Sequence, residues 1–459
     1  MGKTEISNKM GTEAIPKVML KMAIPMILSM ILQAFYNIVD SAFVSNMDNN
    51  GEEALNALTL AFPIQMLIIA IGIGTGVGMN ALVSKCLGEK NYKKAGKVAG
   101  NAIFLAAVIY ILFLLFGLLG VRTYILSQSG NTVIVDMACT YLKICCIFSF
   151  GIVFFSIYEK LLQASGRSIF STIAQVLGAV TNIALDPIMI YGYFGCPKFG
   201  VSGAAYATVI GQCVSFISAL IFHLKFNKEI PNKLRYISPS FKIIKQIYMI
   251  GLPAIIAQAL MSVMTYILNI ILVSINEAMV TAYGLYYKIQ QFILFAAFGV
   301  RDAITPITAF NYGMKSKKRI NDSVKFGLIY TIIIMLLGTA AIEIFANSFS
   351  SLFGLSGVTE SYLISAMRII SLSFVFAGFN IALQGVFQAV MGGLESLVVS
   401  VLRQFVLVIP VAYFLSIFIK ENGNLSFIIW FAFLFAEVFT SIVAYCLYKR
   451  IYKKRIKSL

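Results

Sequence analysis

An aspartate, Asp40, stands deep inside an apolar run that starts near Val18. A charged residue in such a run is costly and is a functional hypothesis by default. Tyr36 and Asn37 precede Asp40 by four and three residues, and side chains at these spacings share one face of a helix. This face therefore combines a carboxylate with a phenol and an amide, a set of oxygen atoms that suits a small cation.

A second aspartate, Asp186, stands in another apolar run. Asn182 lies one helical turn before it, and Pro187 follows it directly. Because proline has no N–H, the carbonyl of Ile183 is left without its usual helical donor. A carboxylate, an amide and a free carbonyl on one turn form an oxygen-rich site suited to Na⁺ or a proton.

The elements that must position these residues are twelve apolar runs. Of the 459 residues, 59% are hydrophobic and 12% are charged, whereas soluble domains carry roughly 25% charge. A bilayer core requires about 20 apolar residues per helix. We therefore predict an all-α membrane protein with helices at 18–45, 54–84, 98–120, 133–156, 168–192, 202–225, 247–274, 280–310, 326–347, 361–387, 398–419 and 426–448.

Lysine and arginine gather in alternate connections between these runs, at 85–97, 225–245, 315–325 and 449–457. The positive-inside rule places those connections and both termini in the cytoplasm, which requires an even number of spans. Short basic loops also account for the net charge of +17, so we expect no nucleic-acid partner.

The height of the polar residues in the bilayer follows from the helical rise of 1.5 Å per residue. Asp40 lies roughly 33 Å along the first helix from Val18, and Asp186 roughly 27 Å along the fifth from Ser168. Thr208 lies only ~9 Å into the sixth helix from its outer end. We predict that all three share one layer in the outer half of the bilayer. The alternative is that both aspartates are interfacial residues that reach the outer surface.

The two halves of the chain repeat. Pro25 matches Pro253 at an offset of 228, and Gln163-Ala164 matches Gln388-Ala389 at an offset of 225. A repeat of six helices keeps its orientation, which predicts two parallel six-helix bundles with a pseudo-twofold relation, an architecture of transport proteins. The predicted parts are an N-terminal lobe at 1–225, a cytoplasmic linker at 226–246 and a C-terminal lobe at 247–459.

The repeat does not extend to the acids. Asp40 maps to Leu268 or Asn269, and Asp186 maps to Ile409. The deep acid of the second half is Glu437, whose counterpart is Gln212. We weigh a structural role for Glu437, paired with Arg403, against a functional one, and we interpret Arg301-Asp302 as a local structural pair.

Several motifs that would indicate other functions do not occur in the sequence. It contains no G-x-x-x-x-G-K-[ST] phosphate loop and no C-x-x-C pair among its seven cysteines, and its single histidine is His223. We therefore expect no enzyme activity and no cofactor. The alternating glycines Gly72, Gly74, Gly76 and Gly78 predict close helix packing.

The ordered set of these segments resembles the multidrug and toxic compound extrusion (MATE) family over nearly the whole chain. The resemblance is carried by the Asp40 segment, Gly88-Glu89 before a basic loop, Gln163–Ser168, Asn182…Asp186-Pro187 and Gly203–Thr208. It implies a monomeric antiporter of the bacterial plasma membrane that exchanges a cationic or amphipathic drug for Na⁺ or H⁺ by alternating access.

The resemblance also implies site residues. The cation site would consist of Asp40, Asn182, Asp186 and Thr208. Another branch of the family carries acids in the seventh and tenth helices, where this chain has Gln258, Met261, Asn380, Gln384 and Gln388. The expected drug-binding residues are Tyr36, Asn37, Gln175, Gln258 and Gln384.

The alternative function is a flippase of the same superfamily for lipid-linked oligosaccharide or peptidoglycan precursors. Such a protein handles an anionic pyrophosphate and needs buried arginines in its cavity. The candidates in this sequence are acids, which favours a cationic substrate.

Overall fold

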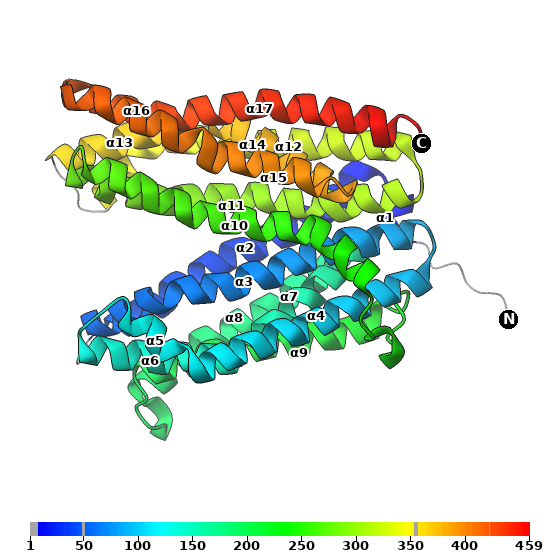
Figure 1. Ribbon diagram of the computed structural model, residues 1–459, viewed down its shortest axis with the longest axis horizontal. Coiled ribbons are helices and arrows are strands. Elements are labelled where there is room, and N and C mark those ends of the chain that lie inside the picture. The colour runs from blue at the N-terminus through cyan, green and yellow to red at the C-terminus, as the bar shows by residue number, and fades with distance from the viewer. Residues whose placement is uncertain (1–7, 48–50, 353–356, 422) are drawn as a thin grey trace. The chain divides into compact units, whose positions relative to one another are not determined.

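The computed structural model describes residues 8–47, 51–352, 357–421 and 423–459, and of Asn37 it describes the backbone only. This part of the chain is helical, with no strand (Figure 1). Ten helices are long and apolar enough to cross a membrane, and two pairs of shorter helices form bent spans. The prediction of an all-α membrane protein with about twelve spans is confirmed.

The chain forms two compact units. Unit 1 contains the described residues up to Thr12 and Leu28–Ile255, and unit 2 contains Glu13–Ile27 and Ile256–Leu459. The helices of unit 1 are α1 (Lys9–Thr12), α3 (Gly51–Gly88), α4 (Tyr92–Leu119), α5 (Val121–Leu126), α6 (Thr132–Ile147), α7 (Phe150–Ala164), α8 (Ser168–Tyr191) and α9 (Val201–Phe226). Those of unit 2 are α11 (Glu277–Gly313), α12 (Lys317–Leu352), α13 (Gly357–Ser371), α14 (Phe374–Ala389), α15 (Gly393–Val401), α16 (Val408–Glu421) and α17 (Phe431–Ile451).

Two long helices belong to both units. Helix α2 (Ile15–Ser45) passes from unit 2 to unit 1 after Ile27, and α10 (Phe241–Val273) passes from unit 1 to unit 2 after Ile255. The two crossing points are 228 residues apart, which is the offset between Pro25 and Pro253. The boundaries between the two units therefore follow the same repeat as the sequence.

Each half contains one span that is broken in the middle. Helices α6 and α7 meet at 45°, and α13 and α14 meet at 52°. A Ser-Phe pair follows each break, and the hydroxyl of Ser373 donates to the carbonyl of Ile370 at 2.7 Å. A serine that bonds to its own backbone competes with the helical hydrogen bonds. The single helices predicted over 133–156 and 361–387 are wrong at these points, and the first span continues to Ala164.

Several helices also extend beyond the predicted apolar runs. Helix α12 begins at Lys317 rather than near 326, and α10 begins at Phe241 rather than near 247. Outside the hydrocarbon region a helix keeps its backbone bonds while its side chains become charged, so hydropathy underestimates its length. The connection between α9 and α10 is accordingly 227–240, and it belongs to unit 1.

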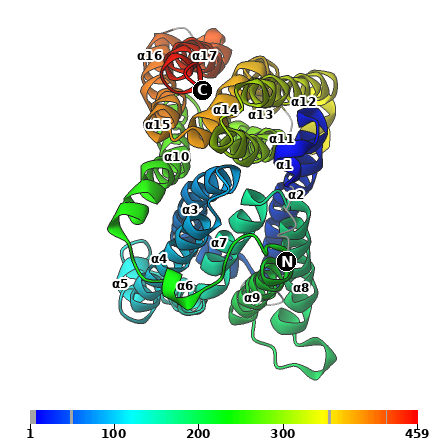
Figure 2. The same ribbon diagram turned by 90° about the vertical axis from the view of Figure 1, so that its right-hand side faces the viewer.

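The alternating glycines of α3 serve two helix contacts, as predicted. A Cβ at Gly72 or Gly76 would press on Ser156 or Lys160 of α7, with 2.8 Å between Gly76 and Lys160 Cγ. A Cβ at Gly74 or Gly78 would overlap α10. Seen along the helices, α7 lies between α3 and α9 (Figure 2). Small residues on two faces thus let α3 approach two neighbours closely.

A matching hydrogen bond in each unit confirms the repeat. In unit 1 the Asn80 side-chain amide donates to the carbonyl of Lys160 at 3.1 Å. In unit 2 the Thr305 hydroxyl donates to the carbonyl of Gly385 at 3.2 Å. Both donors and both acceptors differ by 225 in residue number.

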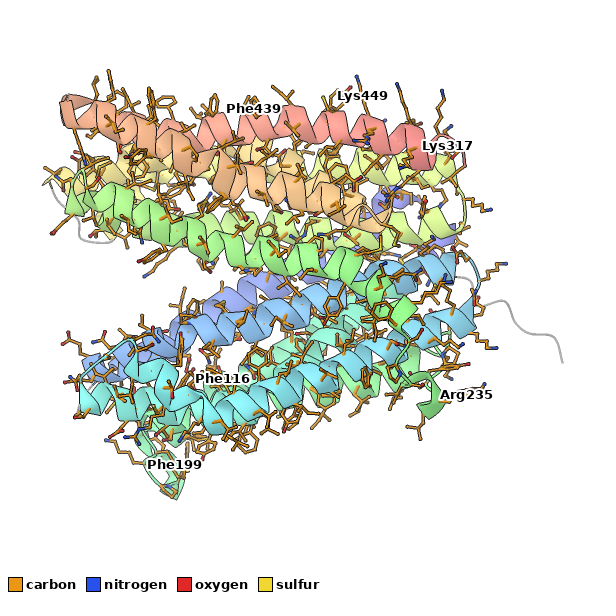
Figure 3. All side chains as sticks on the ribbon, viewed as in Figure 1. Phe116, Phe199, Arg235, Lys317, Phe439 and Lys449 are labelled. Carbon is orange, nitrogen blue, oxygen red and sulfur yellow. The ribbon has the colours of Figure 1, made fainter. Side chains whose placement is uncertain are left out.

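The outer surface of the helices is apolar. Leu119, Ile344 and Phe414 are each more than 70% exposed, and Phe439 also points outward (Figure 3). In unit 2 the basic residues Lys317 and Lys449 lie at the same end (Figure 3). Apolar sides and charged ends are the surface of a multi-pass membrane protein.

The contact between α3 and α10 yields a stability prediction. Gly78→Ala would overlap the backbone of Ile247, and overpacking of this kind costs about 1–3 kcal/mol. We expect a melting temperature several degrees lower for the purified protein in detergent. Gly284→Ala on α11 is the matched control, because nothing lies within 4 Å of its Cβ, and it should not lower the melting temperature. Equal melting temperatures for both variants would contradict this packing.

Candidate functional site

The two predicted aspartates lie in unit 1 on neighbouring helices. Asp40 on α2 is 9% exposed and Asp186 on α8 is fully buried. The two carboxyl groups interact electrostatically, and Tyr36 interacts with Asp40 in the same way. The burial of both side chains argues against the alternative in which they reach the outer surface as interfacial residues.

Close packing of α8 against α9 brings the other two predicted ligands together. A Cβ at Gly178 would overlap Ser215 and the carbonyl of Gly211, and a Cβ at Gly211 would lie 2.9 Å from Cβ of Asn182. One turn from Gly211 stands Thr208, whose Oγ1 lies 3.5 Å from Nδ2 of Asn182. Gly178 and Gly211 thus let α8 and α9 approach closely enough for the Asn182 amide to contact the Thr208 hydroxyl.

Four oxygen atoms of this group have no hydrogen-bond partner among the described residues. They are Oδ1 of Asp40, Oδ1 of Asn182 and both carboxyl oxygens of Asp186. Buried polar atoms are nearly always paired, so each exception calls for an explanation such as a water or an ion. Carboxylate, amide and hydroxyl oxygens are the ligands that hard cations prefer. The chemistry of these four oxygen atoms therefore suits a small hard cation, and a proton would suit the two carboxylates.

Asp40 borders a cavity of ≈ 320 Å³, here called the Asp40 cavity. This volume lies at the lower end of the range of drug-sized binding sites, about 300–1,000 Å³. Within it, Gln65 Nε2 donates to the Tyr141 hydroxyl at 3.2 Å. The remaining lining is largely apolar, with side chains such as Leu55, Leu58, Phe62, Met66 and Ile68. The cavity therefore offers one carboxylate among apolar and aromatic groups.

A second cavity of ≈ 50 Å³, here called the Glu159 cavity, lies beside the first. Asn182 and Glu159 line the second cavity only. The wall between the two cavities is the set of residues that lines both, namely Tyr36, Ile69, Ile152, Thr208 and Gln212. Of the candidate cation ligands, Thr208 thus lines both cavities, Asp40 lines the first and Asn182 the second, whereas Asp186 lines neither.

The predicted drug-binding residues are divided between the units. Tyr36 and Gln175 lie in unit 1, where Gln175 lines the Glu159 cavity and donates to Oε1 of Gln33 at 3.2 Å. The side chain of Asn37 lies outside the described part of the chain. In unit 2, Gln384 is buried and donates to Ser400 at 2.9 Å, and Gln258 is exposed. Neither glutamine of unit 2 lines the two cavities.

Several polar residues line the two cavities without having been predicted as site residues, among them Gln65, Tyr141, Gln212 and Glu159. The repeat offset of 225 could have indicated two of them. Gln212 is the counterpart of Glu437, and Glu159 is the counterpart of Gln384. Glu159 was overlooked because the predicted fourth span ended at residue 156, before the end of α7.

The deep acid of unit 2 is fully paired. Glu437 Oε1 accepts hydrogen bonds from Nε and Nη2 of Arg403, at 2.9 and 2.6 Å, and Oε2 accepts one from Asn380 at 2.8 Å. This confirms the pairing with Arg403. The neighbours Arg301 and Asp302 also form the expected ion pair, at 2.8 Å. Unit 1 also pairs one buried acid, Glu229, with Arg167 at 2.7 Å. Asp40 and Asp186 differ from these paired acids, because three of their carboxyl oxygens have no partner among the described residues.

Comparison with known families agrees with the repeat. The profile of the MatE family matches residues 25–188 and again 253–414. The two matches cover more than half of the chain and begin at Pro25 and Pro253. The chain belongs to the MatE family.

Individual MATE proteins are similar over nearly the full length. The chain is 25% identical to the multidrug export protein MepA of Staphylococcus haemolyticus, over 93% of this chain and 92% of that protein. A solved structure described as the outward-facing conformation of a multidrug resistance MATE family transporter matches with 26% identity and a TM-score of 0.90, over 100% of both chains.

A third relative limits what the family alone says about substrates. The structure of a MOP superfamily transporter from Pyrococcus furiosus matches with 27% identity and a TM-score of 0.88, over 99% of this chain and 100% of that one. It is described as having a binding pocket of reverse polarity that suggests a different function. The charge of the preferred substrate must therefore be argued from the residues of each member.

The unpaired carboxylate of Asp186 yields a prediction about stability. A buried polar group without a partner costs about 1–3 kcal/mol, and more when charged. Asp186→Asn should therefore raise the melting temperature of the purified protein in a Na⁺-free buffer at neutral pH. The exposed Asp136 provides the control, and Asp136→Asn should leave the melting temperature unchanged. A lower melting temperature for Asp186→Asn would show that the carboxylate is satisfied in the folded protein.

Proposed function

We propose that this protein is a cation-coupled antiporter that exports cationic or amphipathic drugs across the bacterial plasma membrane. The observation that carries the proposal is the pair of buried carboxylates, Asp40 and Asp186, with three unpaired oxygen atoms beside a drug-sized cavity. Family membership supports transport as the activity, and the naming of MepA as a multidrug export protein supports the substrate class.

The lining of the cavities supports a cationic substrate. Among the described residues that line either cavity, two are carboxylates, Asp40 and Glu159, and none is lysine or arginine. A carboxylate in surroundings of low dielectric attracts cations strongly. Aromatic and methionine side chains such as Phe62 and Met66 pack against flat apolar molecules of varied shape. A flippase for pyrophosphate-linked lipids would need basic groups in these positions.

Coupling follows from competition for the same carboxylates. When Asp40 and Asp186 are ionised, they attract a cationic drug into the Asp40 cavity. When Na⁺ or a proton neutralises them, that attraction is lost and α2 repacks, so drug and coupling cation are favoured in different states of the carrier. A ligand shifts such an equilibrium only by its differential affinity for the two states. Alternating access between the states then exchanges the coupling cation for the drug across the membrane.

The distribution of charge supports an orientation with both termini in the cytoplasm, because the basic connections all fall on one side of an even number of spans. In this orientation the Asp40–Asp186 layer lies in the outer half of the bilayer. The coupling cation then enters from outside along its electrochemical gradient, and the drug leaves in the opposite direction.

The direct test uses proteoliposomes and ethidium, a cationic dye. An imposed Na⁺ or H⁺ gradient should drive ethidium in the direction opposite to the flow of the cation. Asp40→Asn or Asp186→Asn should reduce this transport to the level of protein-free liposomes, because the neutral amide cannot exchange a cation. Asp136→Asn serves as the control and should transport like the wild type. Full activity in both site variants would refute the proposed site.

The identity of the coupling ion can be read from the same preparation. At constant pH, ethidium transport should rise with the Na⁺ gradient if the site takes Na⁺, and should be insensitive to it if the site takes a proton. In either case one of the two gradients should be sufficient for transport. Equal transport in the absence of both gradients would contradict coupling.

A further inference from the structure

Glu159 is a half-buried acid of unit 1 that the proposed coupling site does not use. It stands on α7 and lines the Glu159 cavity together with Asn182. It lies roughly 8 Å from the end of α7 at Ala164, where the Ser84 hydroxyl of α3 donates to the carbonyl of Ala164 at 3.0 Å. In the proposed topology this is the cytoplasmic end of unit 1. Asn182, by contrast, lies roughly 21 Å along α8 from Ser168.

The carboxylate of Glu159 is held in a polar chain. Its Oε1 accepts a hydrogen bond from Nε2 of Gln163 at 2.8 Å, and Oε1 of Gln163 accepts one from Nζ of Lys160 at 2.9 Å. Lys160 is 4% exposed, and its side chain runs over Gly76, which leaves room for it. A lysine buried this deeply is rare unless it compensates another charge. The arrangement supplies a positive charge close to Glu159 at the cytoplasmic side.

Unit 2 lacks both members of this arrangement. The counterparts of Glu159 and Lys160, at an offset of 225, are Gln384 and Gly385. Gln384 is bonded to Ser400 at 2.9 Å, so the equivalent position is neutral and satisfied. The repeat itself therefore does not require an acid here, and Glu159 lies in the same unit as Asp40 and Asp186.

The cavity between Asn182 and Glu159 suits a small cation and not a drug. Its ≈ 50 Å³ is well below the volume of about 300 Å³ at which drug-sized sites begin, but it holds a few water molecules. The buried Oδ1 of Asn182 in its lining has no partner among the described residues. Gln212, Ser215 and Gln175 add further polar groups to the lining.

We propose that Glu159 is an inner binding station for the coupling cation on its way from the Asp40–Asp186 site to the cytoplasm. The cation leaves Asn182, crosses the Glu159 cavity and is bound at the Glu159 carboxylate, and the nearby ammonium of Lys160 favours its release. The drug uses the Asp40 cavity, so the two ligands share the coupling site but follow different routes. This inference rests on the proposed function.

The test separates the movement of the cation from the handling of the drug. In proteoliposomes, gradient-driven ethidium transport requires release of the cation on the cytoplasmic side, whereas ethidium–ethidium exchange without a gradient does not. Glu159→Gln should slow gradient-driven transport about tenfold, the size of effect expected when one hydrogen bond to a charged group is lost. Exchange should stay within twofold of wild type, and Glu159→Asp should restore most of the driven transport. Glu89→Gln, at the end of α3, is the matched control and should behave like the wild type.

Two other results would contradict the proposal that Glu159 is an inner binding station. Wild-type driven transport by Glu159→Gln, with Asp40→Asn inactive, overturns it and leaves the proposed function intact. Loss of both driven transport and exchange in Glu159→Gln also overturns it, because Glu159 then serves the drug or the fold. If Asp40→Asn is also fully active, the proposed function fails together with the inference.

Discussion

A carboxylate buried in apolar surroundings without a cationic partner is the constraint on which the rest of unit 1 depends. Burying a charge is costly unless it is paired, and a group so placed is neutralised by whatever cation can reach it. Asp186 is fully buried, and neither of its oxygens has a partner among the described residues. The glycine contacts of α8 and α9, the adjoining cavities and the polar groups of α7 can all be understood as ways to let a cation reach this point.

The contrast between the two halves shows what the fold itself does not require. Both halves share the broken fourth span and the proline near the crossing point. They also share an equivalent hydrogen bond, donated by Asn80 in unit 1 and by Thr305 in unit 2. Unit 2 nevertheless satisfies its deep acid, Glu437, with Arg403 and Asn380. Removing one partner of such a buried pair destabilises a protein, so that pair is a structural element. In unit 1, Glu229 is paired in the same way with Arg167, whereas neither oxygen of Asp186 has a partner among the described residues.

Much of this could be predicted from the sequence, because the bilayer imposes a length and a polarity on each helix. Hydropathy placed twelve spans, and the cost of burying charge singled out Asp40 and Asp186. Hydropathy could not show the breaks after α6 and α13, because both halves of each broken span are apolar. At the second break the Ser373 hydroxyl bonds to the backbone of Ile370, a local competition that composition does not report. The same boundary error hid Glu159, which lies on a helix that continues beyond its apolar run. The hydrogen bond between Gln65 and Tyr141 in the Asp40 cavity joins helices that are distant in sequence, so the sequence did not indicate it.

The central claim is that drug and coupling cation compete for one pair of carboxylates. The most direct measurement is the affinity of the purified protein for ethidium, followed by fluorescence polarisation as Na⁺ and pH are varied independently. For the wild type, raising the concentration of the coupling cation should weaken ethidium binding. In the variant that carries both Asp40→Asn and Asp186→Asn, ethidium binding should be weaker and independent of Na⁺ and pH. An unchanged cation dependence in that variant would contradict the account.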